Sequence, residues 1–271
     1  MMDEELLTKL AKRIEGKYYG KYRGFVLDRA DPEQLGRVLV QVPSVLASEP
    51  VGWALPCAPV GGLDNQGMFA IPEVGAQLWV EFEEGDIAQP IWTGTFWQPG
   101  TVPAEAALDE PTTTLFRTPS GHTVQFDDAE GEEQFSLRHP AGAEMQVDKD
   151  GTVAITDAQG AKLTLDAAGG QVIVEDANGN TLTMTSAGTT VEDANGNKIE
   201  MAASGINVKG QQIVIEGSQV MLGGAGGEPV IKGQSFLTLF ATHVHPTGVG
   251  PSGPPIPQGE MSSLSMKVMT A

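Results

Sequence analysis

Residues Val174–Met184, with the sequence VEDANGNTLTM, return 17 positions later as Val191–Met201, VEDANGNKIEM. A weaker copy, DAQGAKLTL over Asp157–Leu165, precedes the first by 19 positions. Each copy joins a turn that contains glycine to a short strand in which apolar and polar residues alternate. Asn-Gly is typical of tight hairpins because both central positions of such a turn need positive φ. Repetition at this short period predicts stacked hairpins rather than a closed domain.

The same alternation extends beyond the repeats, from Val124 to Leu222. A period of two sends the aliphatic side chains to one face of a sheet. At about 25 cal/mol per Å², each strand would lose a few kcal/mol of burial if that face stayed in water. We therefore expect identical copies to cover it. Three copies around an axis would make a β-prism with an aliphatic centre, and two would make a flatter sandwich. The last expected strand pairs are Ile213 with Ile215 and Val220 with Leu222.

The aromatic residues predict a different structure for the N-terminal third. Eleven of the 16 Phe, Trp and Tyr residues lie between Tyr18 and Trp97, whereas the 100 residues from Ser136 to Ser235 contain none. Short alternating strands separated by Gly or Pro turns in this part indicate a compact barrel. The expected strands are Tyr22–Leu27, Arg37–Val42, Gly52–Leu55, Gln77–Phe82 and Ile91–Phe96.

The remaining segments complete an all-β organisation with one short helix. Apolar residues at helical spacing in the first 15 positions predict an amphipathic helix. The stretch Pro99–Thr113 has three prolines and no periodicity, which indicates a linker. The predicted domains are the helix (1–17), the barrel (18–98), the linker (99–113), the stacked hairpins (114–240), which we call the needle, and a C-terminal segment (241–271), which we call the tip.

Composition excludes several classes of partner. The 35 acidic and 16 basic residues give a net charge of −19. Nucleic acid is therefore not an expected partner, because its binding depends on Lys and Arg, and stable adsorption to anionic membranes is disfavoured. The charged N-terminus, Met1–Glu15, lacks a signal-peptide segment, so we expect synthesis in the cytoplasm. The single cysteine, Cys57, excludes an intrachain disulfide and is predicted to be a small buried side chain.

Many short motifs over residues 18–260 resemble, in the same order, the central spike proteins of contractile phage tails and the VgrG proteins of type VI secretion. Those of the barrel are Tyr22-Arg23-Gly24, Asp31-Pro32, Gly36-Arg37-Val38, Trp53-Ala54, Pro72-Glu73-Val74-Gly75, Phe82-Glu83-Glu84-Gly85-Asp86 and Pro90-Ile91-Trp92-Thr93-Gly94. Those at the start of the needle are Arg117–His122, Phe126-Asp127-Asp128 and Leu137-Arg138-His139. The resemblance implies an OB-type (oligosaccharide/oligonucleotide-binding) barrel followed by an intertwined trimeric β-helix.

The resemblance also implies a mechanical function. The protein would be a homotrimer that docks to a baseplate hub protein and pierces the target envelope on sheath contraction. It would not be an enzyme, and it would meet the target membrane only during puncture. It would be part of a phage-tail-like particle, either a virion or an extracellular or cell-associated injection system. VgrG proteins carry a hub domain and some phage spikes a lysozyme domain; neither is found here, so the resemblance is to a minimal spike.

A candidate metal site lies near the C-terminus, at His243 and His245. On a strand, these two side chains would point to the same side. Three copies would bring six imidazoles together, an octahedral set that suits iron better than tetrahedral zinc. Spikes of this family carry a comparable His-x-His that holds an iron ion at the apex. The alternatives are a capping layer without metal and a seat for a separate PAAR-type tip protein. The other two histidines, His122 and His139, are predicted to be structural.

Three other functions remain alternatives. A β-helical enzyme that degrades polysaccharide could use paired carboxylates, and Asp157, Asp176 and Asp193 could be proposed as calcium ligands. Each of these aspartates stands three residues before a glycine, however, which favours turn chemistry. A nucleic-acid or carbohydrate binding module would need a basic groove with aromatic residues. The small basic and aromatic cluster at residues 18–23 is expected instead to pack the barrel wall or to meet the hub.

Overall fold

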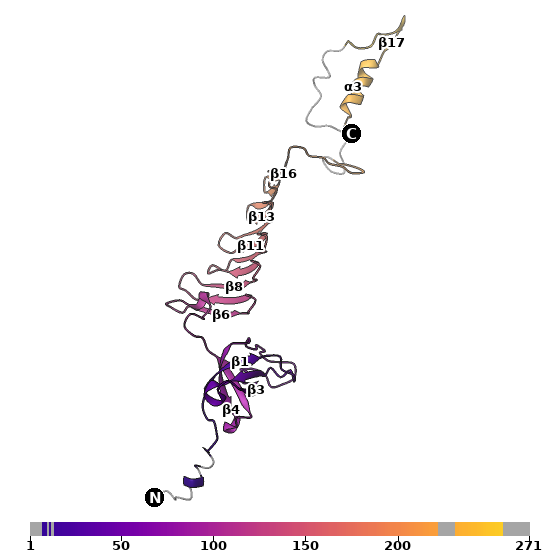
Figure 1. Cartoon of the computed structure of the whole chain (residues 1–271). Coiled ribbons are helices and arrows are strands. Elements are labelled where there is room, and N and C mark those ends of the chain that lie inside the picture. Colours follow the sequence, from indigo (N-terminus) through magenta and orange to yellow (C-terminus); the bar gives the residue numbers. More distant parts are fainter. Residues whose placement is uncertain (1–6, 10, 12–13, 222–230, 257–271) are drawn as a thin grey trace. The chain divides into compact units, whose positions relative to one another are not determined.

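The computed structural model describes residues 7–9, 11, 14–221 and 231–256. The chain divides into two units, residues 1–210 and 211–271. The first unit contains a closed barrel and an 11-stranded sheet, and the second contains a helix and a two-stranded hairpin (Figure 1). The predicted all-β class is confirmed. Residues 7–9, 11 and 14 are helical, as expected for the N-terminus.

Five strands close the barrel in the order β1-β2-β3-β5-β4. Only β3 and β5 pair in parallel; the other neighbours are antiparallel. Each strand lies within a few residues of its predicted position. The short helices α2 (Pro43–Leu46) and η1 (Glu83–Gly85) were not predicted. The strands are β1 (Tyr22–Asp28), β2 (Val38–Gln41), β3 (Pro50–Pro56), β4 (Gln77–Phe82) and β5 (Pro90–Thr95).

The barrel encloses a core of its own. Alternate residues of its strands point inward, and each core side chain is at most 9% exposed. Tyr18 and Tyr22 pack against this core, and their rings lie 5.7 and 5.5 Å from that of Phe82. The core residues are Val26, Val38, Val40, Val42, Ala54, Leu78, Val80, Phe82 and Trp92.

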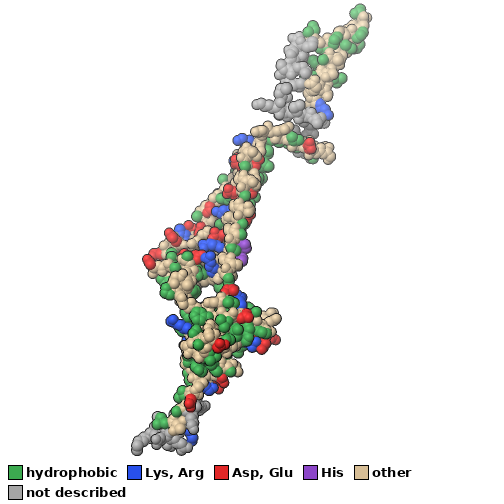
Figure 2. Space-filling view, in the orientation of Figure 1, with side chains coloured by type: hydrophobic (Ala, Val, Ile, Leu, Met, Phe, Trp, Pro, Cys, Tyr) green, Lys and Arg blue, Asp and Glu red, His purple; other side chains and the backbone are tan. Residues whose placement is uncertain are grey.

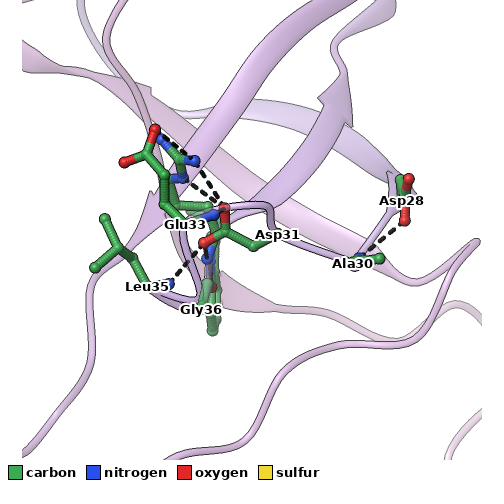
Figure 3. A network of polar contacts seen from close by, with 8 residues as sticks. Asp28, Ala30, Asp31, Glu33, Leu35 and Gly36 are labelled. Atoms are coloured by element: carbon green, nitrogen blue, oxygen red, sulfur yellow. Dashed lines mark hydrogen bonds and ion pairs between the residues drawn. The ribbon is translucent and has the colours of Figure 1, made fainter.

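Asp31 holds the loop between β1 and β2 in place (Figure 3). Its Oδ2 accepts backbone N–H groups of Leu35 at 2.8 Å and Arg37 at 3.2 Å. Its Oδ1 accepts the N–H of Glu33 at 3.1 Å and two guanidinium donors of Arg37 at 3.0 and 2.7 Å. The Arg37 guanidinium holds the pKa of Asp31 well below its usual range. The Asp31-Pro32 turn is therefore a rigid, charge-assisted loop.

The second region is a meander in which every strand pairs antiparallel with the strand before and the strand after it. Both edges of each inner strand are thus occupied by the same chain. The strands are β6 (Thr113–Arg117), β7 (Thr123–Asp127), β8 (Gln134–Arg138), β9 (Glu144–Val147), β10 (Val153–Thr156), β11 (Lys162–Asp166), β12 (Gln171–Glu175), β13 (Thr181–Thr185), β14 (Gly188–Glu192), β15 (Lys198–Ala202) and β16 (Gly205–Lys209).

The register of these strands aligns the aliphatic residues in two rows on one face, as the alternation predicted. One row contains Phe116, Val124, Leu137, Met145, Ile155, Leu163, Val174, Leu182, Val191, Ile199 and Val208. The other contains Phe126, Phe135, Val147, Val153, Leu165, Val172, Met184, Met201 and Ile206, with Thr189 between Met184 and Met201. We call this surface the aliphatic face.

The segment before the sheet is more ordered than its composition predicted. A short helix, η2 (Ala104–Ala106), contacts β6. Glu105 forms an ion pair with Arg117, and the N–H of Asp128 donates to the carbonyl of Thr112 at 3.0 Å. The second half of the predicted linker is therefore attached to the first strands of the sheet.

The predicted strands beyond residue 209 are wrong. Ile213, Ile215 and Val220 lie in irregular chain, and Leu222 is outside the described residues. Helix α3 (Gly233–Thr242) spans the end of the expected needle (114–240) and the start of the expected tip (241–271). Phe236, Leu239 and Phe240 have the spacing of a helix, which the prediction of continuous period-two strands did not take into account. Apolar alternation produces a strand only where a neighbouring strand supplies hydrogen-bond partners.

Candidate functional site

The aliphatic face is uncovered among the residues that the structure describes. The barrel core is at most 9% exposed, whereas Ile155 and Leu165 are each 44% exposed and Ile206 is 69% exposed. Near its first strands the face forms a shallow hollow of about 450 Å³, lined in part by Phe116, Leu137 and Met145. An apolar surface of this length is typical of a protein–protein interface.

The opposite face of the sheet carries charged side chains in complementary positions. Lys162 lies opposite Glu175, and Lys198 opposite Glu192. Arg138 donates from Nε to Glu144 at 2.8 Å. Such cross-strand pairs of opposite charge stabilise a solvated face modestly, and Figure 2 shows acidic and basic side chains interspersed over the sheet. Gln125 and Ser136, on the first strands of this face, are buried. Beyond them the polar face is suited to water, whereas the aliphatic face is suited to a partner.

The repeated aspartates belong to the turns, as predicted. Asp176 Oδ1 accepts the backbone N–H groups of Asn178 and Asn180 at 2.8 and 2.9 Å, and Asp193 accepts those of Asn195 and Asn197 at 2.8 and 2.9 Å. The side-chain amide of Asn180, which donates to Asp176, lowers the pKa of that carboxyl to about 2.

Asp157 accepts backbone N–H groups in the same way, at 2.8 and 2.9 Å. A glycine with positive φ follows three residues later in each of these turns. The carboxylates thus stabilise the hairpins, which weakens the case for calcium ligands or catalytic acids.

His243 and His245 do not lie on a strand, which corrects the expected basis for their alignment. His243 is the residue directly after α3, and His245 precedes the hairpin of β17 (Pro246–Thr247) and β18 (Gly250–Pro251). Their ring centroids are nevertheless 5.0 Å apart. The end of the helix and the start of the hairpin, rather than the alternation of a strand, bring the two rings together.

Both residues are held by local hydrogen bonds. The Nδ1 of His243 donates to the carbonyl of Phe240 at 2.5 Å, because a carbonyl can only accept, and its Nε2 is left as the acceptor. The N–H of His245 donates to Ser252 Oγ at 2.8 Å, and the N–H of Ser252 donates to the carbonyl of His245 at 2.7 Å. A backbone carbonyl on the second ring nitrogen is the usual support of a metal-binding histidine.

This geometry fits two ligands of one ion. With a metal–nitrogen distance of about 2.1 Å, imidazoles at 90° to 109° around an ion place their centroids about 4.5–5.2 Å apart. The distance of 5.0 Å lies in that range. Within the described part of the chain, no group of three or more His, Cys, Asp or Glu could hold a metal. Further ligands would have to come from other copies or from water.

Two other predictions concern the barrel surface. Cys57 is exposed, not buried, because it starts the loop after β3 and only its backbone N–H is held, by the carbonyl of Trp92 at 2.9 Å. Lys21 pairs with Glu81 at 2.8 Å, and Arg23 lies over the rings of Trp79 and Phe96. These cations are engaged by the barrel wall, so they do not supply the basic groove that a nucleic-acid binding module needs.

Residues 22–97 match the family model described as the type VI secretion system/phage-baseplate injector OB domain. These residues coincide with the closed barrel, and together the match and the barrel support a relationship to the VgrG-like spike family. The matched domain family is structural rather than enzymatic. No curated protein matches the chain. None of the helices in the described residues has the length and apolar character to cross a membrane.

The match and the fold support a structural role in a phage-baseplate or type VI secretion injector for a chain with an injector-type OB domain followed by an antiparallel sheet. Such a domain implies contact with other baseplate or tail components.

Proposed function

We propose that this chain is the homotrimeric central spike of a contractile phage-tail-like injection system. In this function the barrel docks to a hub ring of the baseplate, and the sheet belongs to a needle that breaches the target envelope when the sheath contracts. The match of residues 22–97 to the injector OB domain supports the baseplate location. The open aliphatic face supports self-association, and it is the observation that carries the proposal.

The pairing of the strands favours one kind of trimer over residues 113–209. Because consecutive strands of one chain already hydrogen-bond to each other, strands of another copy have no free edge between them. Three sheets would instead pack with their aliphatic faces inward as a prism. The intertwined β-helix implied by the resemblance would then be limited to other residues of the needle. A prism of 11 strands at about 4.8 Å each is roughly 50 Å long.

The proposed mechanism is mechanical. Force along a needle is resisted by the backbone hydrogen bonds between strands and by the apolar contacts between copies, which must both break before a strand separates. The excess of acidic residues keeps the outer surface hydrated and disfavours adhesion to anionic envelopes.

At the tip, His243 and His245 of three copies would supply six imidazoles to one iron ion. The ion would crosslink three chain ends where the apolar contact is smallest. The hydrogen bond from His243 to Phe240 supports this assignment, because it orients Nε2 for metal binding. A seat for a PAAR-type tip protein at the same apex is the second candidate.

The mass of the purified full chain tests the trimer. We expect multi-angle light scattering to give three chain masses at micromolar concentration and after tenfold dilution. A single chain mass across that range would contradict the proposal. Co-purification with a tagged hub protein from the same particle tests docking separately. A trimer that does not bind the hub protein would contradict the proposed docking to the baseplate but not the trimer itself.

Elemental analysis tests the tip. The trimer purified without added metal is expected to contain about one iron per three chains. Replacing both His243 and His245 by Ala should remove the iron, whereas His122→Ala should leave it. Iron that persists in the double variant would show that these residues are not its ligands.

A further inference from the structure

A second pair of histidines, His122 and His139, lies next to the paired strands β7 and β8 of the sheet. Thr123 pairs with Arg138 at the last register position between β7 and β8. His122 directly precedes β7 and His139 directly follows β8, so they face each other at the end of the strand pair that lies away from its connecting turn. Their rings lie 4.7 Å apart at 74°, and both side chains are exposed. By the period of two, they are on the same side as Val124 and Leu137, at the margin of the aliphatic face.

The distance between the two rings is compatible with binding of one ion by both. The separation of 4.7 Å lies within the range of about 4.5–5.2 Å expected for two imidazoles that are adjacent ligands of a metal. The backbone at both positions is fixed, since Thr118 N–H donates to the His122 carbonyl at 2.9 Å and His139 N–H donates to the Ala143 carbonyl at 2.8 Å. The turns thus hold the backbone at both positions in place.

The hydrogen bonds of the Nδ1 atoms determine what metal binding through Nε2 would require. His122 Nδ1 lies 2.9 Å from Ser120 Oγ, which can accept its proton and leave Nε2 as the metal ligand. His139 Nδ1 accepts the N–H of Ala141 at 3.1 Å, so its Nε2 carries the proton. For an ion to bind at His139 Nε2, the proton must move from Nε2 to Nδ1, which breaks the hydrogen bond from Ala141. The ligand must therefore have a strong preference for imidazole nitrogen.

We propose that His122 and His139 bind a divalent transition-metal ion of the class that prefers imidazole, namely Zn²⁺, Ni²⁺ or Cu²⁺, with water completing the coordination. Within the described residues, no carboxylate joins these histidines in a group that could hold a metal, which disfavours Mg²⁺ and Ca²⁺, because both take oxygen ligands. Arg138, the nearest cation in sequence, is engaged by Glu144 and Gln125, and the chain carries a net charge of −19. This site is separate from the tip, and it needs residues of one chain only.

The repeated turns provide a matched control. His139 occupies the first position of a five-residue turn, where Asp157, Asp176 and Asp193 stand in the later turns. In each case the side chain of the first residue accepts the N–H two positions later. Asn at position 139 can accept the same N–H with its amide oxygen, but it is a poor ligand for zinc. His139→Asn therefore removes the imidazole while it retains the turn.

Equilibrium dialysis of the full chain against Zn²⁺, followed by elemental analysis, tests the proposal. A variant with His243→Ala and His245→Ala, stripped of metal first, removes the tip as a ligand. We expect it to bind one zinc per chain and to bind no Mg²⁺. Adding His122→Ala, or His139→Asn, should abolish the zinc without a change in circular dichroism.

Zinc retained in either of these added variants would overturn the site, as would the absence of zinc from the tip variant. A stoichiometry of one per chain differs from the one per three chains expected for an axial tip. Because the site uses residues of one chain, we expect zinc binding in a monomer as well as in a trimer. Failure of the proposed trimer and failure of this site are therefore distinguishable.

Discussion

The barrel and the sheet are built from the same alternating strands, but only the barrel covers its apolar side chains. In the barrel, β1 pairs with both β2 and β4, so the sheet closes and one face becomes an interior. In the sheet, β6 and β16 remain at opposite ends of a linear order. All nine buried hydrophobic residues in the described part of the chain lie in the barrel. Alternation thus specifies two faces, whereas closure decides whether one of them is buried by the same chain.

The largest expected effect is a charge on the aliphatic face. Leu165→Asp would place an unpaired carboxylate in each copy of the proposed contact, at a cost of several kcal/mol per buried ion. We expect the assembly to dissociate to single chains, as measured by light scattering. Thr164→Asp is the matched control, because Thr164 is adjacent but on the opposite face. Equal masses for the two variants would show that the aliphatic face is not the contact.

A truncation in the barrel core should have a smaller but local effect. Leu78 is fully buried, so Leu78→Ala is expected to lower the free energy of unfolding of the barrel by about 2–5 kcal/mol. Tryptophan fluorescence in urea reports this transition alone, since the four tryptophans, at positions 53, 79, 92 and 97, are all in or next to the barrel. Leu165→Ala, the same truncation in the sheet, should leave the fluorescence midpoint unchanged. A shift in that control would mean that the two regions unfold together.

The smallest expected effect concerns acid. The pKa of Asp176 is lowered to about 2, and that of Asp193 is lowered by the side-chain amide of Asn197. A carboxyl with a lowered pKa in the folded state stabilises it above the ordinary value of about 3.9, and this contribution is lost as the pH falls toward 2. Replacing both with Asn should make the sheet less sensitive to pH between 4 and 2.

Far-UV circular dichroism during acid titration measures this change. The control is Asp150→Asn. The carboxylate of Asp150 pairs with the side chain of the adjacent Lys149, so its loss does not remove a hydrogen bond of the Asp176 or Asp193 turn. An acid transition that is unaltered in the Asp176 and Asp193 variant would mean that these turns do not limit the stability of the sheet.

Local pattern was sufficient where one strand follows another with a short turn. The five barrel strands, the strand repeat to residue 209 and the aspartate turns could all be predicted, because each depends on a few neighbouring residues. The pattern failed for residues 211–221, where the same alternation has no strand beside it, and for α3, whose apolar spacing also fits a helix. It also failed for Cys57, whose exposure depends on the path of the loop after β3.

The amino-acid sequence by itself determined the all-β class, the position of the barrel and the division of the sheet into an aliphatic and a polar face. These follow from side-chain periodicity, which is local and independent of what the strand meets. Only the tertiary structure decided that the barrel closes, that the sheet stays open, and that His122 meets His139 across a hairpin while a helix end places His243 beside His245. Whether a sheet closes, and which histidines meet, depends on strand register and on the path of the chain. Both bring together residues that are distant in the sequence, and no local pattern relates such residues.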